Sequence, residues 1–248
     1  MTPPTIPKSH KPSTIEHLTV ELAGEAVQLD PRGVLLLDHG QTIVVADLHL
    51  EKGSAFARRG TFLPPYDTLA TLVRLETIVN SLRPERLISL GDGFHDSAGA
   101  RLLTGEVADR LQRLAQRLEW IWIRGNHDEL LPDTLPGTIR DDLTLGHLTL
   151  RHLPDRETGN LIAGHLHPIA RIGDRRRKTR RPCFVHDRRL MLMPAFGSYT
   201  GGLNILDPVI SGLFDTTFTP YLLGQHRLHR TRPDLLIPDP PDWRRHRI

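Results

Sequence analysis

Four apolar runs in the sequence each end in side chains that can bind metal ions. The runs lie in IVVADLHL (43–50), LISLGDGFHD (87–96), WIWIRGNHD (120–128) and LIAGHLH (161–167). Their polar ends contribute Asp47, His49, Asp92, Asn126, His127, His165 and His167. Carboxylates, amide oxygens and imidazoles are the donors that hard and borderline divalent metals take in proteins. One Asp-x-His triplet is common by chance, but four such segments in one chain indicate a shared site.

The elements that must hold these residues are short strands and two helices. Apolar runs predict strands at 34–38, 43–47, 87–91, 120–124, 160–164, 189–194 and 203–206. A helical period covers 66–82 and 102–118, and residues 143–150 fit a hairpin with a Gly-X turn. Helices between the early strands, followed by hairpins, predict an α/β fold of two packed β-sheets flanked by helices. Because such sheets bind ligands at the carboxyl ends of strands, the four segments should meet at one edge.

The composition is that of a globular protein without a membrane span. Of 248 residues 38% are hydrophobic, and no apolar run approaches the roughly 18 residues that cross a bilayer. We expect one domain at 15–225, between a flexible proline-rich tail at 1–14 and a Pro- and Arg-rich tail at 226–248. The N-terminus lacks the apolar core of a secretory signal, and the single Cys183 excludes an internal disulfide. Both observations predict a cytoplasmic protein that does not contact a membrane.

Arginine dominates the basic residues, and the arginines are unevenly placed. Only four of the 32 basic residues are lysine, and residues 175–181 read RRRKTRR, six cations in seven positions. A guanidinium can bind two phosphate oxygens at once. Two interpretations stay open at this point. Most charge runs are solvated surface, whereas a run this dense also fits contact with a polyanion.

The order of the polar segments resembles that of the calcineurin-like metallophosphoesterases: D-x-H, GD, GNHD, a lone histidine and GHxH. The resemblance implies a calcineurin-like metallophosphoesterase sandwich that holds two divalent metal ions. The first ion would be held by Asp47, His49, Asp92 and His167. The second would be held by Asp92, Asn126, His152 and His165, so that Asp92 bridges the two ions. By the same resemblance His127 is the catalytic histidine and Asp128 orients its ring.

Two positions in this pattern have alternatives. Both His147 and His152 precede GHLH, but His147 falls in the expected hairpin turn. His152 ends the strand that leaves the turn, where the other ligands also lie, and this favours His152. Many relatives carry an aspartate three residues after the GD aspartate, where this chain has His95 followed by Asp96. His95 is interpreted either as a contact to a ligand or substrate, or as a packed surface histidine.

A narrower resemblance covers residues 34–206. The segments ADLHLEKGSAFARRG, LPPYDT, LGDGFHD and PAFGSYTGG are together similar to the ligase-associated DNA damage response endonucleases, the PdeM group. That resemblance implies a Mn²⁺-dependent nuclease that acts on DNA in repair, together with a helicase and a DNA ligase. Fe, Zn and other divalent ions stay open, and the sequence does not define the oligomeric state.

The chemistry expected of such a centre is hydrolysis of a phosphodiester. A hydroxide bridging the metals would attack phosphorus in DNA, and His127 would protonate the leaving oxygen. The expected substrate contacts are Arg58, Arg59, His95, Arg175, Arg176, Arg177 and Tyr199. One alternative is a phosphodiesterase or phosphatase for small molecules or nucleotides on the same metal centre. Another is a metal-free binding scaffold, which is disfavoured because every ligand position of the pattern is present.

Overall fold

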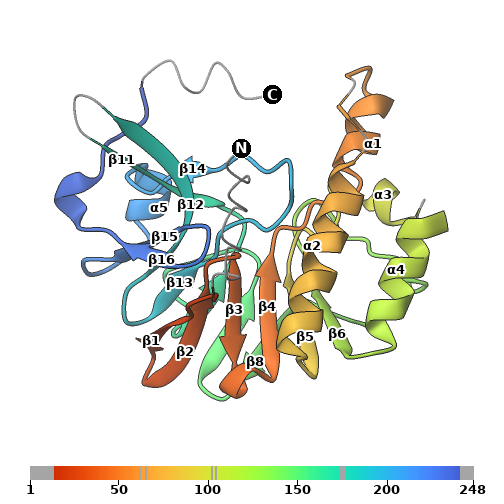
Figure 1. The fold of residues 1–248 in the computed structure, drawn as a ribbon, viewed down its shortest axis with the longest axis horizontal. Coiled ribbons are helices and arrows are strands. Elements are labelled where there is room, and N and C mark those ends of the chain that lie inside the picture. Colours follow the sequence, from red (N-terminus) through yellow and green to blue (C-terminus); the bar gives the residue numbers. More distant parts are fainter. Residues whose placement is uncertain are drawn as a thin grey trace, which may run out of the picture.

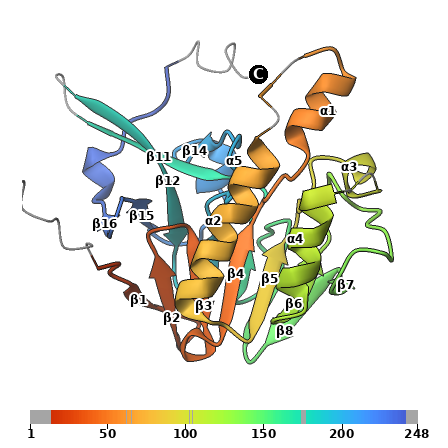
Figure 2. The ribbon, with the colours of Figure 1, turned by 45° about the vertical axis from the view of Figure 1, so that its right-hand side comes forward.

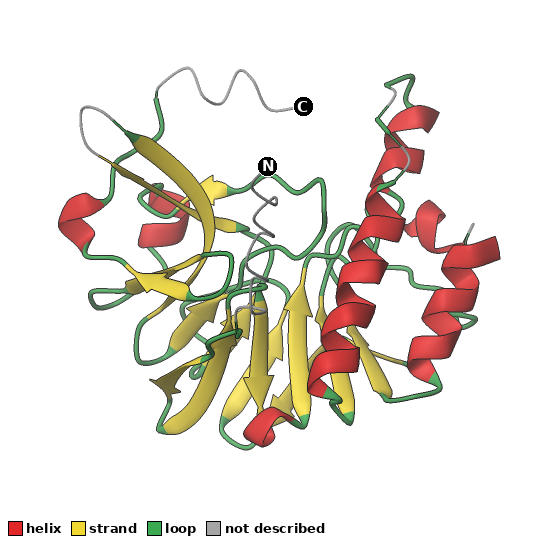
Figure 3. Ribbon diagram, viewed as in Figure 1, coloured by secondary structure: helices red, strands yellow, loops and turns green. Residues whose placement is uncertain are grey.

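Two β-sheets face each other, and helices cover the outer face of the first sheet (Figures 1 and 3). The structure is a computed structural model, and it describes residues 14–61, 63–64, 66–101, 103, 105–173 and 177–240. The arrangement confirms the predicted α/β fold of two packed sheets flanked by helices. Among the helices of these residues, none is long and apolar enough to cross a membrane.

The first sheet has seven strands in chain order. They are β1 (Leu18–Leu22), β2 (Glu25–Asp30), β3 (Val34–Leu37), β4 (Thr42–Ala46), β5 (Arg86–Leu90), β6 (Glu119–Ile123) and β7 (Thr138–Arg140). The strands β1 to β4 pair antiparallel, whereas β4 to β7 are parallel. Parallel neighbours need crossover connections. Here α2 (Asp67–Leu82) connects β4 to β5, and α4 (Gly105–Ala115) connects β5 to β6. The carboxyl ends of β4, β5 and β6 therefore lie side by side.

The second sheet is mixed, in the order β14-β11-β12-β13-β10-β9-β8, with β15 on β12 and β16 on β15. Its strands are β8 (Asp142–Leu145), β9 (Leu148–Arg151), β10 (Leu161–Ala163), β11 (Pro168–Gly173), β12 (Lys178–His186), β13 (Leu190–Leu192), β14 (Leu203–Asn204), β15 (Thr219–Leu223) and β16 (Leu228–Arg230). The strands β9 and β10 are parallel neighbours, so their carboxyl ends also lie together. Five short helices complete the described chain: η1 (Asp38–Gly40), α1 (Lys52–Arg58), α3 (Ser97–Arg101), α5 (Pro208–Ser211) and η2 (Pro233–Leu235).

The central strands of the first sheet are buried on both faces. In β4, Ile43 and Val45 pack in the core beneath the helices, while Val44 and Ala46 pack in the core between the sheets. Successive side chains of a strand point to opposite faces. A strand covered on both sides therefore needs a continuous apolar run, which is what β4 has before Asp47. The apolar runs hold the strands in place, and the polar residues after them are free for chemistry.

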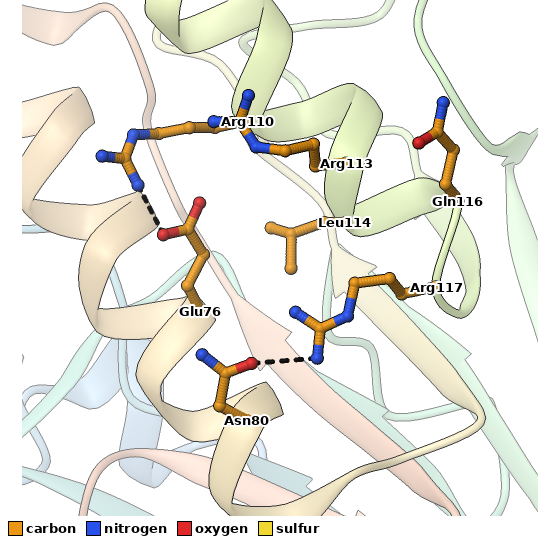
Figure 4. Close-up of a pocket in the computed structure, with 7 residues that line it drawn as sticks. All are labelled: Glu76, Asn80, Arg110, Arg113, Leu114, Gln116 and Arg117. Carbon is orange, nitrogen blue, oxygen red and sulfur yellow. Dashed lines mark hydrogen bonds and ion pairs between the residues drawn. The ribbon is translucent and has the colours of Figure 1, made fainter.

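Arginines on α4 and just after it bind side chains of α2, away from these strand ends. A cavity of about 310 Å³ lies between α2 and α4, lined by Glu76, Asn80, Arg110, Arg113, Leu114, Gln116 and Arg117 (Figure 4). Arg110 donates to Glu76 over 2.5 Å, and Arg117 donates to Asn80 over 2.9 Å. The dashed lines of Figure 4 mark both contacts, which join α4 (Arg110) and the residues just after it (Arg117) to α2. None of the seven lining residues is a candidate metal ligand, so this cavity belongs to the helix packing.

The described part of the segment predicted as a C-terminal tail packs on the second sheet. Its strand β16 pairs with β15, and the Ile237 N–H donates to the carbonyl of Arg171 in β11 over 2.9 Å. Figure 2 shows this blue segment running beside the β11–β12 hairpin. The domain boundaries at 15 and 225 stay predictions, and residues 1–13 and 241–248 lie outside the described residues.

The core between the sheets should contribute more to stability than the exposed face of the helices. Val44→Ala removes two methyl groups from a site that is 0% exposed. At about 0.8 kcal/mol for each buried carbon, plus a cavity left behind, we expect the free energy of unfolding to fall by about 2 kcal/mol. The matched control is Val73→Ala on α2, where the side chain is 44% exposed and the change should be close to zero. Urea denaturation of both variants measures the difference, and equal losses would contradict the assignment of this core.

Candidate metal centre

The candidate ligands follow the ends of five strands from both sheets. Asp47 comes directly after β4, Asp92 follows β5 after one intervening glycine, and Asn126 follows β6. His152 follows β9, and His165 and His167 follow β10. The two sheets meet at this edge: Ala46 bridges to Ala195, and the Phe196 N–H donates to the Ala46 carbonyl over 2.8 Å. The first sheet therefore supplies the carboxylates and the amide, and the second sheet supplies three of the imidazoles.

Asp47, His49 and His167 form a first group, in which each offers one ligand atom and these atoms lie within 4.8 Å of one another. The Nε2 atoms of His49 and His167 are 3.3 Å apart, and His167 Nε2 lies 3.4 Å from Asp47 Oδ1. Two ring nitrogens at this distance need a proton or a cation between them, because their lone pairs otherwise repel. The donor set and its spacing fit a divalent metal ion.

Asp92, His152 and His165 form a second group within the same 4.8 Å limit. Asn126 belongs to it as well, since its Oδ1 lies 3.0 Å from His152 Nε2. Asp92 Oδ1 is 3.4 Å from His152 Nε2, while Asp92 Oδ2 is 3.8 Å from His49 Nε2 in the first group. The two oxygens of one carboxylate thus face the two groups. Asp92 is placed to bind two metal ions at once.

The surroundings of His49 and Asp92 keep these two donors in the forms that bind a metal. Burial, followed by the neighbouring His167, lowers the pKa of His49 to about 3, so its ring is neutral. Its Nδ1 atom is buried and has no hydrogen-bond partner among the described residues. Burial is the largest single influence on Asp92 and opposes its charge, but the hydrogen bonds with His152 and the His127 N–H, together with the charges of His152 and His49, hold the pKa of this carboxyl below its ordinary value. Neutral imidazole and ionised carboxylate are the ligand forms.

The backbone at the site is held in an unusual conformation. Five candidate ligands have positive φ angles: Asp47 (54°), His49 (44°), Asp92 (45°), His165 (67°) and His167 (45°). Residues other than glycine adopt this left-handed region at a cost of roughly 1–3 kcal/mol each. Such residues concentrate at functional sites, because the surrounding structure imposes a geometry that the chain would not choose. The sharp turns direct the side chains back toward the strand ends.

Glycines beside the ligands allow the loops to approach one another. A Cβ atom on Gly125 would lie 2.1 Å from Asp92 Oδ1, and one on Gly91 would lie 2.0 Å from His152 Nδ1. A Cβ on Gly164 would lie 2.8 Å from Asp47 Oδ2. At each glycine of the GD, GN and GH motifs, a Cβ atom would therefore occupy the space that a ligand side chain fills. In these motifs the glycine allows the loops to pack closely, and the residue after it is a candidate ligand.

His127 lies beside both groups without being a member of either. Its backbone N–H donates to Asp92 Oδ1 over 3.0 Å, and its ring Nδ1 lies 3.1 Å from the carbonyl oxygen of His95. Since a carbonyl only accepts hydrogen bonds, Nδ1 carries the proton and Nε2 is left for other chemistry. The ring stacks on the ring of His95, with centroids 5.3 Å apart, and meets the ring of His49 edge-on at 5.3 Å.

The predicted role of Asp128, orienting the His127 ring, has no supporting contact among the described residues. Its carboxylate is fully buried and accepts hydrogen bonds from the backbone N–H groups of Phe94 and Gly125, over 3.0 and 2.8 Å. These contacts join the loop after β5 to the loop after β6, and each carboxylate oxygen accepts one of the two N–H groups. The carbonyl of His95 holds the His127 ring instead. Burial raises the pKa of Asp128 to about 6 despite the two hydrogen bonds.

The predicted substrate contacts are brought together only in part. His95 lies at the site, because its ring packs against those of His49 and His127, and burial lowers its pKa to about 4. Arg58 binds both oxygens of Asp96 over 2.8 and 2.7 Å, so its fork has a partner within the protein. Tyr199 is 36% exposed, and its carbonyl accepts from Lys52 over 2.8 Å.

The remaining predicted residues lie on the periphery or outside the described residues. Arg59 is exposed at the end of α1, and Arg177 is exposed before β12. Arg175 and Arg176 lie outside the described residues. His147 is exposed in the β8–β9 turn, where its N–H donates to Glu25 over 3.0 Å, whereas His152 is 2% exposed within the second group.

Sequence reasoning missed two features of the site. Lys52 is half-buried, and its charge is close enough to lower the pKa of both His49 and His95. It lies in the segment EKG, which general phosphoesterase motifs do not require, and that was the available signal. A cavity of about 390 Å³ also borders Asn126 and His152, with arginines and carboxylates on its other walls. Its lining comes from three segments, 124–129, 141–142 and 151–153, and only the fold brings these segments together around one cavity.

Two packed sheets that carry two groups of candidate metal ligands at their strand ends are the arrangement of a hydrolase that uses metal ions. Residues 40–192 match the calcineurin-like phosphoesterases, and the chain belongs to that family, as the order of its motifs predicted. No curated protein matches the chain.

Similar solved structures come from three bacteria. The crystal structure of the Pseudomonas putida nuclease MPE has a TM-score of 0.68 and 29% identity, and the match covers 87% of this chain and 100% of that chain. AQ665 from Aquifex aeolicus, a protein of unknown function, has a TM-score of 0.36 and 19% identity, with 54% and 81% covered. The E. coli phosphoesterase Yfce has a TM-score of 0.36 and 16% identity, with 74% and 88% covered.

The close approach at Gly125 predicts that one added methyl group will disturb the metal centre. Gly125→Ala should displace the Asp92 carboxylate and reduce the bound metal below that of the wild type, because the new Cβ meets Oδ1 and the backbone N of Asp92 within 2.2 Å. Gly159→Ala is the matched control, since nothing lies within 4 Å of its Cβ position. Elemental analysis of both purified variants after metal loading gives the result. A full complement of metal in Gly125→Ala would show that the loop relaxes without moving Asp92.

Proposed function

We propose that this protein is a metal-dependent nuclease that hydrolyses phosphodiester bonds in DNA. Its family places it among phosphoesterases, so hydrolysis of a phosphoester is the class of reaction. Two findings support DNA as substrate: the similarity to the nuclease MPE over 87% of this chain, and the sequence resemblance to the PdeM group. The observation that carries the proposal is the Asp92 carboxylate, with one oxygen 3.4 Å from His152 and the other 3.8 Å from His49.

The metal sites have donors that suit two divalent ions, and we propose Mn²⁺ for both. When bound, such a pair activates a water molecule and neutralises the charge of the phosphoryl oxygens. Carboxylate, amide oxygen and imidazole are all ligands that Mn²⁺ accepts. Asp92 would fix the spacing of the two ions. The Nε2 of His49 faces His167 in the first group, while its Nδ1 has no hydrogen-bond partner in the part of the chain that the structure describes.

His127 is the residue best placed to move a proton. Its Nδ1–H is held by the His95 carbonyl, so Nε2 on the other side of the ring is the atom that, when the ring carries both protons, would give one to a leaving oxygen and return to the neutral ring. Its backbone N–H donates to Asp92 Oδ1, which ties this acid to the metal centre. General acid catalysis by a positioned histidine contributes about 10²–10⁴ in rate. We propose that His127 supplies this factor for esters whose leaving group needs a proton.

The pathway is a separate proposal. The resemblance of the segments ADLHLEKGSAFARRG and PAFGSYTGG to the ligase-associated endonucleases supports a role in DNA repair with a helicase and a DNA ligase as partners. That support comes from the sequence alone.

One observation favours a small-molecule phosphodiesterase or phosphatase as the second candidate. Two of the arginines near the site are engaged by carboxylates: Arg58 by Asp96 at 2.7 Å and Arg180 by Asp239 at 3.3 Å. Paired guanidinium groups attract a DNA backbone less strongly than unpaired ones. Assays on single-stranded, duplex and nicked DNA, alongside nucleotides and aryl phosphates, distinguish the candidates. Cleavage of nucleotides without cleavage of any DNA would replace the nuclease with the second candidate.

Asp92→Ala should abolish cleavage of DNA and reduce the bound metal from two ions per chain to one or none. The substitution removes a donor that faces both groups and leaves the repulsion between two cations unshielded. Asp109→Ala, on the exposed face of α4, is the control and should leave both quantities unchanged. Metal content by elemental analysis and cleavage of labelled DNA are the measurements. Two tightly bound ions in Asp92→Ala would exclude a bridging role.

His127→Ala should keep both metals and slow hydrolysis of DNA by about 10²–10⁴, the range expected for loss of a general acid. Hydrolysis of bis-p-nitrophenyl phosphate should fall much less, because its aryl leaving group departs without a proton. His147→Ala, in the exposed β8–β9 turn, serves as the histidine control. The ratio of the two losses decides the question: equal losses on DNA and on the aryl ester would rule out proton donation by His127.

A further inference from the structure

The glycine-rich loop 197–202 connects the first metal group to the β11–β12 hairpin. On one side, the ring Nδ1 of His167 donates to the carbonyl of Gly201 over 3.1 Å. This contact leaves His167 Nε2 facing Asp47 and His49. On the other side, the carbonyl of Gly202 accepts from Arg180 Nη2 over 2.7 Å. Two successive carbonyls of the loop therefore hold a metal ligand and an arginine.

The loop has little freedom to move independently of His167. A Cβ atom on Gly202 would lie 2.2 Å from the His167 carbonyl oxygen, so the two backbones are in direct contact. The next residue, Leu203, donates its N–H to the same His167 carbonyl over 3.2 Å. A shift of Gly202 would therefore move both the ring and the backbone of His167.

Arg180 is itself fixed by the C-terminal segment. Its Nε and Nη2 lie 3.4 and 3.3 Å from the two carboxylate oxygens of Asp239, and the two side chains are only 21% and 14% exposed. The segment before Asp239 is anchored to the second sheet: Ile237 donates to the Arg171 carbonyl, and Arg171 donates to the Pro238 carbonyl over 2.5 Å. Asn204, after the loop, donates to the Ile237 carbonyl over 3.1 Å.

These contacts form one connected path from residue 239 to the metal centre. Asp239 binds Arg180, Arg180 donates to the Gly202 carbonyl, and the carbonyl of the adjacent Gly201 accepts from the imidazole of His167. A hydrogen bond to the second nitrogen of a metal-binding imidazole fixes the ring and its tautomer. We propose that Arg180 and Asp239 are positioning residues for the first metal ion, acting through the glycine-rich loop on His167.

The inference rests on the metal centre of the proposed function and is independent of the DNA substrate. It assigns a task to a segment beyond residues 40–192, where the chain matches its family. It also assigns different roles to neighbouring residues of the arginine run 175–181. From the sequence, this run was interpreted either as solvated surface or as a contact with a polyanion. Arg180 is directed inward to the loop and Asp239, whereas its neighbour Arg181 is exposed.

The test compares Arg180→Gln with Arg181→Gln, two substitutions of adjacent residues in one strand. Mn²⁺ binding to each full-length protein is measured by titration calorimetry, together with the wild type. Partners of metal-binding histidines typically change metal affinity by 10–100-fold. We expect Arg180→Gln to weaken one of two Mn²⁺ ions by about tenfold or more and to leave the other close to the wild-type affinity. Arg181→Gln should match the wild type for both ions.

Asp239→Asn provides a second variant that keeps the size of the side chain. It should weaken the same ion as Arg180→Gln, and the double variant should lose little more than Arg180→Gln alone, because both act on one path. Arg180→Lys restores a donor to Gly202 and should recover part of the affinity. Thermal unfolding of each metal-free variant separates a local effect from a loss of folding: normal unfolding with one weakened ion supports the proposal.

Three outcomes would overturn it. Unchanged affinity for both ions in Arg180→Gln and Asp239→Asn, with two ions bound by the wild type, rejects the positioning role and leaves the proposed function intact. Equal weakening of both ions rejects a path through His167. Fewer than two ions bound by the wild type rejects the two-metal centre and this inference with it.

Discussion

The rest of the structure depends on the crowding of metal-binding donors at one edge of the two sheets. Two imidazole nitrogens face each other at 3.3 Å, and the carboxylates of Asp47 and Asp92 are almost fully buried beside them. Removing a charged group from water costs free energy unless a partner compensates for it. The backbone N–H groups of His165 and His127 donate to these carboxylates, and the remaining ligand atoms of the two groups face one another. A pair of cations would relieve the repulsion between the lone pairs and compensate for the lost hydration. The arrangement is therefore best understood as a binding site for two metal ions.

Several features of the chain serve to keep that crowding in place. The apolar strands β4, β5 and β6 are buried on both faces and give the ligands a rigid base. Glycines at 91, 125 and 164 leave the room that the ligand side chains occupy. Asp128 uses a buried carboxylate to join the loops after β5 and β6, which carry Asp92 and Asn126. The left-handed turns at the ligands are tolerated because these contacts surround them.

The sequence predicted those elements of the structure that depend on short-range patterns of residues. Buried strands ending in Asp47 and Asp92 could be recognised because a continuous apolar run followed by a polar residue is a short-range pattern, and α2 matched its helical period. The strand β12 was missed because Lys178–His186 begins with exposed basic residues and includes a proline, so its pairing with β11 and β15 decides its conformation. The contacts of Asp128 and of Arg180 could not be predicted either. Asp128 bonds to Phe94, 34 positions away, and Arg180 to Asp239, 59 positions away.

Each metal group takes ligands from both sheets, and this affects how the protein folds. Asp47 and His49 follow a strand of the first sheet and share a group with His167 of the second, and Asp92 shares its group with His152 and His165. An ion bound at either place would act as a cross-link between two layers that otherwise meet through apolar packing. The native state binds such ions and the unfolded chain does not hold their ligands together, so occupancy at 100 times the dissociation constant adds about 2.7 kcal/mol to the free energy of unfolding. The supply of metal in the cell would then regulate how long the folded protein persists as well as how fast it works.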